Sequence, residues 1–420
     1  MKPLTNGFGF MLVFDEKAKH DWFRTRVIRA LFPNKEVVNG YVSWYKQMTQ
    51  QLVKENSYKI SGIPGTRVDI VRNVINLAAV HWASDWLMGT PLKTKNHPIG
   101  LFTEQEMYDV LMLLCTCVFI NVLPERGFFL KDQAQIFGDK VNSLIEKSIE
   151  ACRLPRQRYV ILRCIYIKKD HLTYLQSVFS HVASKASSFL FAQEEKACYP
   201  FLRRLAEIGI ARGEMVSQVI GLSVGSSVNW AQSISQMVDF YLDDARAAER
   251  AEIVKLVQRD DAEAIELLHG YIREGQRLAP QFPGLLRQAA VTDTVDLGDG
   301  RKVDVRAGDL IFSSFYNAQH NETDFPEPNK VNPRRPKESY QNQGSGFHIC
   351  PGVDFTLMTA TEVVKIIFKL PNIRRAPGAA GTMASYTIQQ VPGTDNRMYL
   401  DNTSKETPWP GSLTVVYDDA

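Results

Sequence analysis

Three patterns that would point to a particular chemistry are missing from the 420 residues of this sequence. The six cysteines form no CxxC pair, which argues against a disulfide framework or a zinc site and favours reduced thiols. The eight histidines form no HxxxH or HExxH pattern, which argues against a separate metal site. The first residues lack the charged and then apolar order of a secretory signal. We therefore expect an intracellular protein.

Long apolar runs and an excess of charge of one sign are missing too. The longest apolar run, residues 110–123, is too short to cross a bilayer and predicts a buried helix. The 49 basic and 46 acidic side chains leave a net charge of +3, which is too small to indicate nucleic acid or an anionic membrane as a partner. We therefore expect a soluble, cytoplasmic protein without a transmembrane segment.

What the sequence does contain, over its first two-thirds, is helical periodicity. Apolar residues recur at helical spacing in 20–32, 37–56, 68–89, 103–123, 137–153, 172–193, 199–210, 212–244 and 261–280, and again in 353–370. The stretch 212–244 is long enough to cross much of a domain as one helix. Short alternating runs between 289 and 315, and again in the tail, predict strands and hairpins. We expect a mostly α fold with small β-sheets (α+β), formed by one domain over residues 1–420.

The stretch "GSGFHICPG", residues 344–352, places Cys350 among glycines and directly before a predicted helix. The free N–H groups of a helix N-terminus stabilise a thiolate and lower the pKa of the cysteine. Gly346 and Gly352 would allow the backbone to come close to a flat cofactor. A thiolate facing such a cofactor is the axial ligand of one class of haem proteins. On this stretch alone, a buried and inert cysteine in a turn remains the alternative.

Three further features lie in an order and at distances that fit the haem interpretation. In "EGQR", Glu274 and Arg277 are three residues apart, so they share one helical face and can pair. Arg335 follows in a proline-rich stretch and could reach back to this pair. In "HDWFR", His20 and Arg24 share a helical face and suit carboxylate groups. Taken alone, the Glu274–Arg277 pair would be an ordinary surface ion pair.

Together these features resemble the cytochrome P-450 superfamily, and the resemblance runs essentially from end to end. It implies a cytochrome P-450 fold in which Glu274, Arg277 and Arg335 are structural. It also implies that Cys350 is the axial ligand to the iron of haem b (iron protoporphyrin IX). The helix of His20 begins almost at once, so part of the family's N-terminal region would be lacking. We therefore expect a fragment of a longer polypeptide.

The same resemblance assigns further residues to the haem. The positions that hold the haem propionates in the family are His348, Arg287, His20 and Arg24. Gly346 is the loop glycine four residues before the cysteine. The loop departs from the family pattern at Gln343, where phenylalanine is usual. We expect this departure to tune the iron and to leave the ligand unchanged.

The helix expected to cross the distal face of the haem carries no acid–threonine pair, which an oxygen-activating monooxygenase usually has. It offers Asn229 and Gln232 instead, three residues apart and therefore on one face. Both are neutral amides that donate and accept hydrogen bonds but relay protons poorly. They suit a substrate that already contains the O–O bond. The alternative is that they only satisfy backbone groups of the helix.

The Asn-x-x-Gln pattern, with residues 8–24 and 68–94, resembles the C-terminal haem-thiolate domains of fungal dioxygenase fusions. These are the linoleate diol synthases and psi-factor-producing oxygenases. The resemblance implies isomerisation of a hydroperoxide of linoleic or a related acid, without external electrons or a reductase. It also implies an N-terminal dioxygenase domain as a partner. Heterolytic O–O cleavage would give a diol, and homolytic cleavage an allene oxide or epoxy alcohol; retention of both Asn229 and Gln232 favours the diol.

Two other functions stay open. A reductase-dependent cytochrome P-450 monooxygenase is one, and the missing acid–threonine pair argues against it. A non-catalytic haem-binding domain is the other, and the retention of Cys350, Glu274, Arg277 and Arg335 argues against it. Of the remaining candidates, His81 is interpreted as a core histidine with satisfied hydrogen bonds, Cys115 as an inert thiol, and "KETPWPG" as a surface turn.

Overall fold

The computed structural model describes residues 2–5, 7–95, 97–120, 124–153, 195–298, 300–388, 396–400 and 406–419. The chain forms two compact units. Unit 1 comprises Met1–Pro33, His81–Val110 and Asp132–Val224, and unit 2 comprises Asn34–Val80, Leu111–Lys131 and Gly225–Ala420. The expected helix 172–193 and Cys164 lie outside the described residues. That residues 1–420 form one domain stays a prediction.

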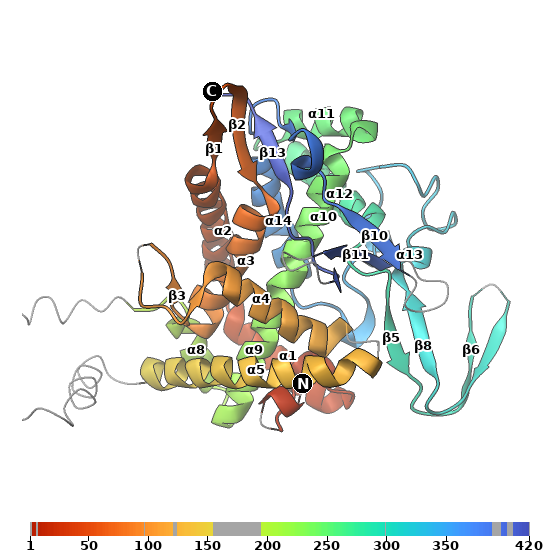
Figure 1. Cartoon of the computed structure of the whole chain (residues 1–420). Coiled ribbons are helices and arrows are strands. Elements are labelled where there is room, and N and C mark those ends of the chain that lie inside the picture. Colours follow the sequence, from red (N-terminus) through yellow and green to blue (C-terminus); the bar gives the residue numbers. More distant parts are fainter. Residues whose placement is uncertain are drawn as a thin grey trace, which may run out of the picture. The chain divides into compact units, whose positions relative to one another are not determined.

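Most of the described residues are helical, as expected (Figure 1). The α-helices are α1 Lys17–Leu31, α2 Lys35–Asn56, α3 Asn76–His81, α4 Glu104–Cys115, α5 Pro124–Arg153, α8 Tyr199–Ala206, α9 Arg212–Ser226, α10 Val228–Leu242, α11 Ala247–Leu256, α12 Ala262–Leu278, α13 Phe315–Ala318 and α14 Val353–Phe368. Wider, π-type turns flank α3 at Val71–Ile75 and Trp82–Met88 and extend α4 over Thr116–Ile120. None of the helices in these described ranges combines the length and apolar character needed to cross a membrane.

Helix starts follow their capping residues. Thr103 was expected to begin a helix, and it forms two hydrogen bonds with Glu106. The backbone N–H of Thr103 donates to Glu106 Oε2 at 2.7 Å, and the backbone N–H of Glu106 donates to Thr103 Oγ1 at 3.2 Å. This reciprocal pattern satisfies two N–H groups that the first turn leaves free. Asn34 caps α2 through Val37 N, at 2.9 Å, and Asp261 caps α12 through Ala264 N, at 3.1 Å.

In unit 1, the chain before α1 is tied to α9. The amide of Gln218 accepts from Met11 N at 3.1 Å and donates to Gly9 O at 3.0 Å. A Cβ atom at Gly221 would lie 2.3 Å from the ring of Phe10, so the close approach requires glycine there. The guanidinium of Arg204 on α8 donates to the carbonyl of Ala30 at the end of α1, at 2.7 Å.

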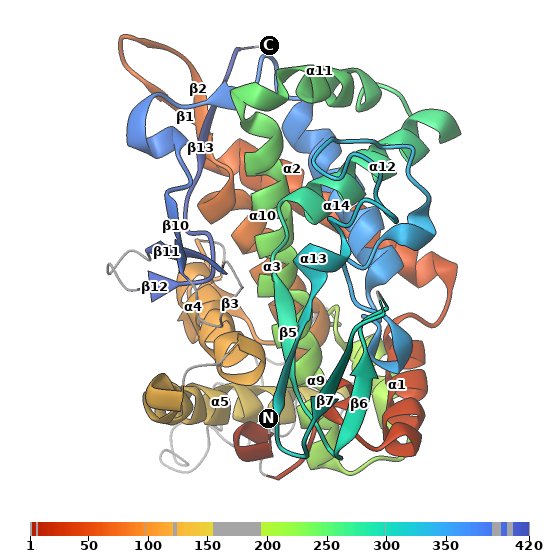
Figure 2. The same cartoon turned by 90° about the vertical axis from the view of Figure 1, so that its right-hand side faces the viewer.

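The core of unit 2 lies where α2, α10 and α14 meet, and Figures 1 and 2 show α2 beside α14. The ring of Tyr45 on α2 lies 4.8 Å from that of Trp230 on α10 and 6.0 Å from that of Phe355 on α14. The indole of Trp230 also donates to Thr359 Oγ1 at 3.0 Å. These contacts fix the segment 229–232 and the start of α14 within one packed cluster.

The sheets of unit 2 are small, as expected. The strands are β1 Tyr58–Ile60, β2 Ile63–Asp69, β5 Gly284–Gln288, β6 Asp293–Asp296, β7 Lys302–Val305, β8 Leu310–Ser314, β9 Arg374–Arg375, β10 Ser385–Ile388, β11 Asn396–Leu400, β12 Glu406–Thr407 and β13 Thr414–Tyr417. They form an antiparallel sheet in the order β1-β2-β13-β9, a three-stranded sheet β10-β11-β12 and two antiparallel two-stranded sheets, β5-β8 and β6-β7. Unit 1 holds the parallel pair β3 Leu92–Lys93 and β4 Phe102–Thr103.

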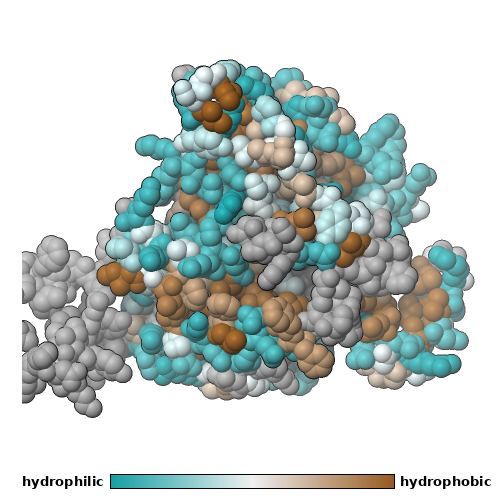
Figure 3. Space-filling view, viewed as in Figure 1, coloured by the Kyte–Doolittle hydropathy of each residue, from teal (hydrophilic) through white to brown (hydrophobic). Residues whose placement is uncertain are grey.

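The β6–β7 hairpin exposes apolar side chains. Val295 and Val303 face each other across the two strands and are 36% and 45% exposed. Figure 3 shows apolar atoms, in brown, where Figure 1 places this hairpin.

Two expectations about helices were wrong. The stretch 212–244 is not one helix, because α9 and α10 are separated at Ser227, whose ψ of −78° departs from helical geometry. The run Gly225, Ser226 and Ser227 consists of weak helix formers, which explains why the helix is interrupted there. The stretch 68–89 begins as the end of β2, and its helical part starts at Val71.

Candidate active site

Cys350 lies on a loop that links a 3₁₀ turn, Gly346–His348, to the start of α14. The backbone N–H of Cys350 donates to Gln343 O at 3.0 Å, which closes the loop on itself. Gly352 N–H donates to Cys350 Sγ at 3.4 Å. The sulfur therefore receives an N–H group at the N-terminus of a helix, the setting that stabilises a thiolate.

The surroundings of the sulfur fit a flat, largely apolar group that carries carboxylates. Gly346 has φ +69°, and a Cβ atom there would meet nothing within 4 Å, so the backbone can be approached closely. The neighbouring side chains Phe347 and Ile349 are 41% and 39% exposed, so an apolar group could pack against them. The loop offers the sulfur of Cys350 with His348 two residues before it, and a cysteine sulfur is the protein ligand that a haem-thiolate site requires.

The side chains expected at the propionates lie in both units. In unit 2, His348 packs against Phe347 at a ring distance of 4.0 Å, and Arg287 is an exposed residue of β5. In unit 1, His20 is 0% exposed and lies 2.9 Å, Nδ1 to Oδ1, from Asp21. Arg24, one turn further along α1, has a buried Nη1 atom without a hydrogen-bond partner among the described residues. That atom fits a carboxylate partner.

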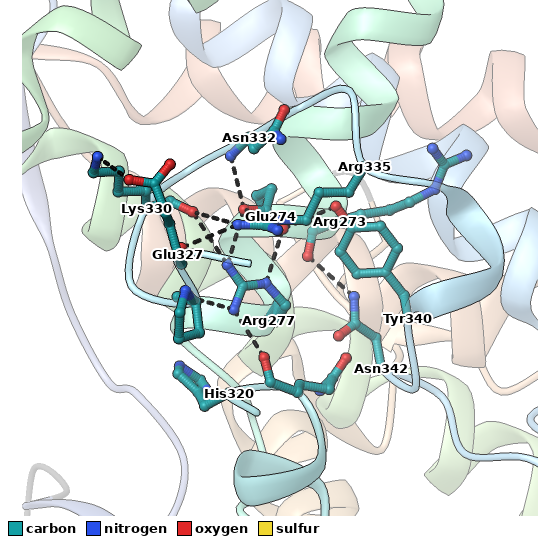
Figure 4. Close-up of polar contacts among 12 residues, drawn as sticks. Arg273, Glu274, Arg277, His320, Glu327, Lys330, Asn332, Arg335, Tyr340 and Asn342 are labelled. Atoms are coloured by element: carbon teal, nitrogen blue, oxygen red, sulfur yellow. Dashed lines mark hydrogen bonds and ion pairs between the residues drawn. The ribbon is translucent and has the colours of Figure 1, made fainter. Parts of the chain in front are cut away.

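Glu274 is the centre of a buried cluster on α12 (Figure 4). Arg277 donates to both of its oxygens, at 2.8 and 2.9 Å, and Arg335 Nε lies 3.5 Å from Oε2. Asn332 N and Tyr340 Oη add hydrogen bonds of 2.9 and 2.8 Å. Burial raises the pKa of Glu274, but the hydrogen bonds from Arg277 and Asn332 outweigh it, so this pKa lies below its usual value. The structure thus joins the three residues named from the sequence and adds two donors.

The same cluster fixes the chain that leads to Cys350. Arg277 also donates to the carbonyls of Gln319 and Pro328, at 2.9 and 2.7 Å. Asn342 Nδ2 donates to Arg273 O on α12 at 3.1 Å, one residue before the Gln343 carbonyl that closes the cysteine loop. The irregular segment between α13 and the cysteine loop is therefore held by side chains of α12.

The two amides expected at the distal side of the haem begin α10 but differ in their surroundings. Asn229 is half-buried; its Nδ2 donates to Gly225 O at 3.3 Å, and its Oδ1 lies 3.4 Å from Cys115 Sγ. Gln232 is 1% exposed, and its Nε2 donates to the carbonyls of Gln281 and Pro408, at 3.2 and 2.9 Å. The amide nitrogens thus do satisfy backbone carbonyls, which was the alternative interpretation. The Oε1 atom of Gln232 is buried without a hydrogen-bond partner among the described residues.

Sequence reasoning missed two side chains beside these amides. Cys115 contacts Asn229, and no sequence signal connects two residues 114 positions apart. Trp409 was placed in a surface turn but is 1% exposed, and its indole donates to Thr116 Oγ1 at 3.0 Å. A tryptophan between two prolines was the available signal, because such a rigid, bulky segment favours a fixed and buried position.

Comparison with known proteins supports the fold. Residues 244–368 match the family model "Cytochrome P450". P450BioI, solved with an acyl carrier protein bearing hexadec-9Z-enoic acid, superposes with a TM-score of 0.62 at 13% identity, over 97% of this chain and 81% of that one. Substrate-free CYP109E1 from Bacillus megaterium gives 0.61 at 15% identity, over 96% and 82%. The family and the fold imply a haem-iron cofactor.

Curated relatives share more sequence. A bifunctional dioxygenase (DOX)-epoxy alcohol synthase (EAS) of Pyricularia oryzae is 32% identical over 90% of this chain and 30% of its own length. One from Fusarium oxysporum is 30% identical over 91% and 28%. A 7,8-linoleate diol synthase of Pyricularia oryzae is 24% identical over 98% and 38%. The chain spans about three-tenths of the length of the first two.

Proposed function

The chain belongs to the cytochrome P-450 superfamily, and we propose that it is a fatty-acid hydroperoxide isomerase that works without external electrons. One observation carries the proposal: α10 bears the amides of Asn229 and Gln232 and contains no acidic residue followed by threonine, the pair usual in an oxygen-activating enzyme. The relatives' names support the substrate class, because epoxy alcohols and diols are both rearrangement products of fatty-acid hydroperoxides. In the full-length protein, a dioxygenase domain would supply the hydroperoxide.

We propose that Cys350 holds haem b through its sulfur, with Gly346 giving the ring room. Arg287, His348, His20 and Arg24 would bind the propionates. When bound, the haem iron supplies the cleavage of the substrate's O–O bond. Gly352 N–H, 3.4 Å from the sulfur, keeps negative charge on Cys350.

The amides then orient the peroxide. Gly225 O accepts from one N–H of Asn229, and the other, which has no partner among the described residues, would donate to a peroxide oxygen. The buried Oε1 of Gln232 is an acceptor that a hydroperoxide O–H would satisfy. Neither amide changes protonation at ordinary pH, so the pair can position the peroxide without delivering protons. This suits isomerisation better than dioxygen activation.

The product class is the finer part of the proposal. The amide pair favoured a diol, whereas the relatives at 30% identity or more are named epoxy alcohol synthases. We propose an epoxy alcohol as the main product. The chain is 30% and 32% identical to the two epoxy alcohol synthases over about nine-tenths of its length, and 24% identical to the diol synthase. We also propose a cytoplasmic location, because the six cysteines form no CxxC pair and their spacing favours reduced thiols.

The test is turnover of hydroperoxylinoleate by the purified haem-loaded protein, without NADPH or reductase, with products of several positional hydroperoxides identified by mass spectrometry. We expect conversion by the wild type and a loss of about 10²-fold in kcat for Asn229→Leu. Cys350→Ser should abolish the ferrous–CO absorption band that is diagnostic of thiolate ligation. Turnover that requires both NADPH and a reductase would instead support the monooxygenase, and an unchanged band would remove Cys350 from the ligand role.

A further inference from the structure

Cys115 ends α4 and contacts one of the two amides. Its side chain is 0% exposed, and Sγ lies 3.4 Å from Oδ1 of Asn229. The nitrogen of the same amide donates to Gly225 O at 3.3 Å. The carboxamide is therefore held at both ends, its oxygen by a side chain of α4 and its nitrogen by the backbone before α10.

The polarity of these contacts fixes the orientation of the amide. Burial raises the pKa of Cys115 well above its usual value, so the thiol keeps its proton and can donate it to an oxygen. A rotation of the amide by half a turn would place its NH2 group against the thiol proton and its oxygen against the Gly225 carbonyl. The contact between the two oxygens would then be repulsive, so the observed orientation is preferred.

This orientation decides what Asn229 can offer to a ligand. Its oxygen accepts from the thiol and one N–H donates to Gly225 O, so the second N–H is the one donor of this amide without a partner among the described residues. We infer that Cys115 is a positioning residue, whose thiol holds the Asn229 amide as a hydrogen-bond donor toward the peroxide. For the identity of the ligand, the inference rests on the proposed function.

The segment around Cys115 is anchored independently of this thiol. Thr116 Oγ1 accepts from the indole of Trp409 at 3.0 Å and donates to Met112 O at 2.8 Å. The Gln232 amide, in contrast, is held by two backbone carbonyls and needs no side-chain partner. Substitution of Cys115 should therefore act on the Asn229 amide, while the segment and Gln232 stay in place.

The hydrogen bond itself can be tested without substrate, by infrared spectroscopy of the S–H stretching region in the purified haem-loaded protein. The band lost in Cys115→Ala identifies the Cys115 thiol. We expect Asn229→Leu to move this band to higher frequency, because the thiol loses its acceptor. Cys117→Ala, two residues on and half-buried, should leave the band in place. A band that does not move in Asn229→Leu would overturn the inference.

Turnover of hydroperoxylinoleate tests the consequence. Loss of one weak hydrogen bond predicts a decrease of about 5- to 10-fold in kcat for Cys115→Ala, with KM changed by less than about twofold. Cys115→Ser keeps a donor and should restore most of kcat, and Cys117→Ala should match the wild type. Equal losses in the alanine and serine variants, or a change in KM alone, would contradict a positioning role.

The two experiments separate the inference from the proposed function. A shift of the S–H band in Asn229→Leu supports the positioning of the amide even if the protein does not convert the hydroperoxide, in which case the proposed function fails. Turnover that is normal in Cys115→Ala would leave the proposed function standing and overturn the positioning role.

Discussion

Two clusters of acidic and basic side chains, one in each unit, are built from similar groups but differ in burial. In unit 2, the side chains of Glu274, Arg277 and Arg335 are 0%, 0% and 5% exposed. In unit 1, His81 lies between two carboxylates, and its side chain is 14% exposed. Arginine stays charged at any pH that a protein tolerates, whereas histidine does not.

The partners of His81 are more exposed than it is. Asp85 and Glu104 are 39% and 28% exposed, and they lie 3.2 and 2.7 Å from Nδ1 and Nε2 of the ring. Water screens such contacts and weakens them. The Glu274 cluster therefore keeps its charges across the pH range in which the protein is folded. The His81 cluster, in contrast, makes the free energy of unfolding depend on pH. Substitutions in each cluster test that distinction.

Glu274→Gln should destabilise the protein by about 3–5 kcal/mol, because the substitution leaves two buried guanidinium groups without a carboxylate. The measurement is the free energy of unfolding from urea titration, with haem retention as a second readout. The matched control is Glu266→Gln on the same helix, whose carboxylate pairs with Arg273 at 3.2 Å but is 68% exposed. We expect about 0.5 kcal/mol or less for the control. Similar losses in the two variants would contradict the contrast between buried and exposed charge.

Tyr340→Phe should have a smaller effect within the same cluster. It removes the hydroxyl that donates to Glu274 Oε1 at 2.8 Å and leaves the ring in place. A hydrogen bond to a charged group contributes about 1.5–3 kcal/mol, and that loss is expected in urea unfolding. Tyr316→Phe is the control, because Tyr316 is 45% exposed and should change stability by less than about 0.5 kcal/mol. An effect of Tyr340→Phe no greater than that of the control would show that Glu274 does not depend on this donor.

The contacts of the Glu274 cluster could be predicted from the sequence only in part. Two residues three apart on a helix share a face, so the pairing of Glu274 with Arg277 follows from helical spacing. Their burial does not follow, because the same spacing describes a surface pair. The contact with Arg335 was expected, but helical spacing cannot establish it, because Arg335 lies 61 positions from Glu274 in an irregular segment. The donor from Tyr340 was not predicted, since it comes from an irregular segment 66 residues away.

The surroundings of Asn229 and Gln232 were less predictable, because their partners also come from segments far away in the sequence. Periodicity describes one element at a time and says nothing about which elements meet. It placed Asn229 and Gln232 on one face, and it could not show that a cysteine of α4 holds one amide or that Pro408 accepts from the other. It also joined α9 and α10 into one helix, because the interruption at Ser227 depends on weak helix formers rather than on a loss of apolar spacing.

His81 was expected to be a satisfied core histidine, and both ring nitrogens do have partners. Asp85, four residues on, was within reach of helical spacing, whereas Glu104 is 23 positions away. Burial lowers the pKa of His81, but the hydrogen bonds that the ring donates to the two carboxylates outweigh it and raise the pKa from 6.5 to about 9. The folded protein therefore holds this proton more tightly than the unfolded chain does.

The sign of the resulting pH dependence follows from that difference. The stabilisation is fully present below pH 6.5, where both states are protonated, and it is lost as the pH rises through about 9. A shift from 6.5 to about 9 corresponds to at most about 3 kcal/mol, and screening of the exposed carboxylates should reduce the measured value to about 1 kcal/mol. Glu104→Gln removes the nearer carboxylate, so the wild type should exceed it in unfolding free energy at pH 6.5 and lose this advantage by about pH 10. A constant difference between the two proteins across this range would mean that His81 is not the group that titrates, and the contrast between the two clusters would then lie in burial alone.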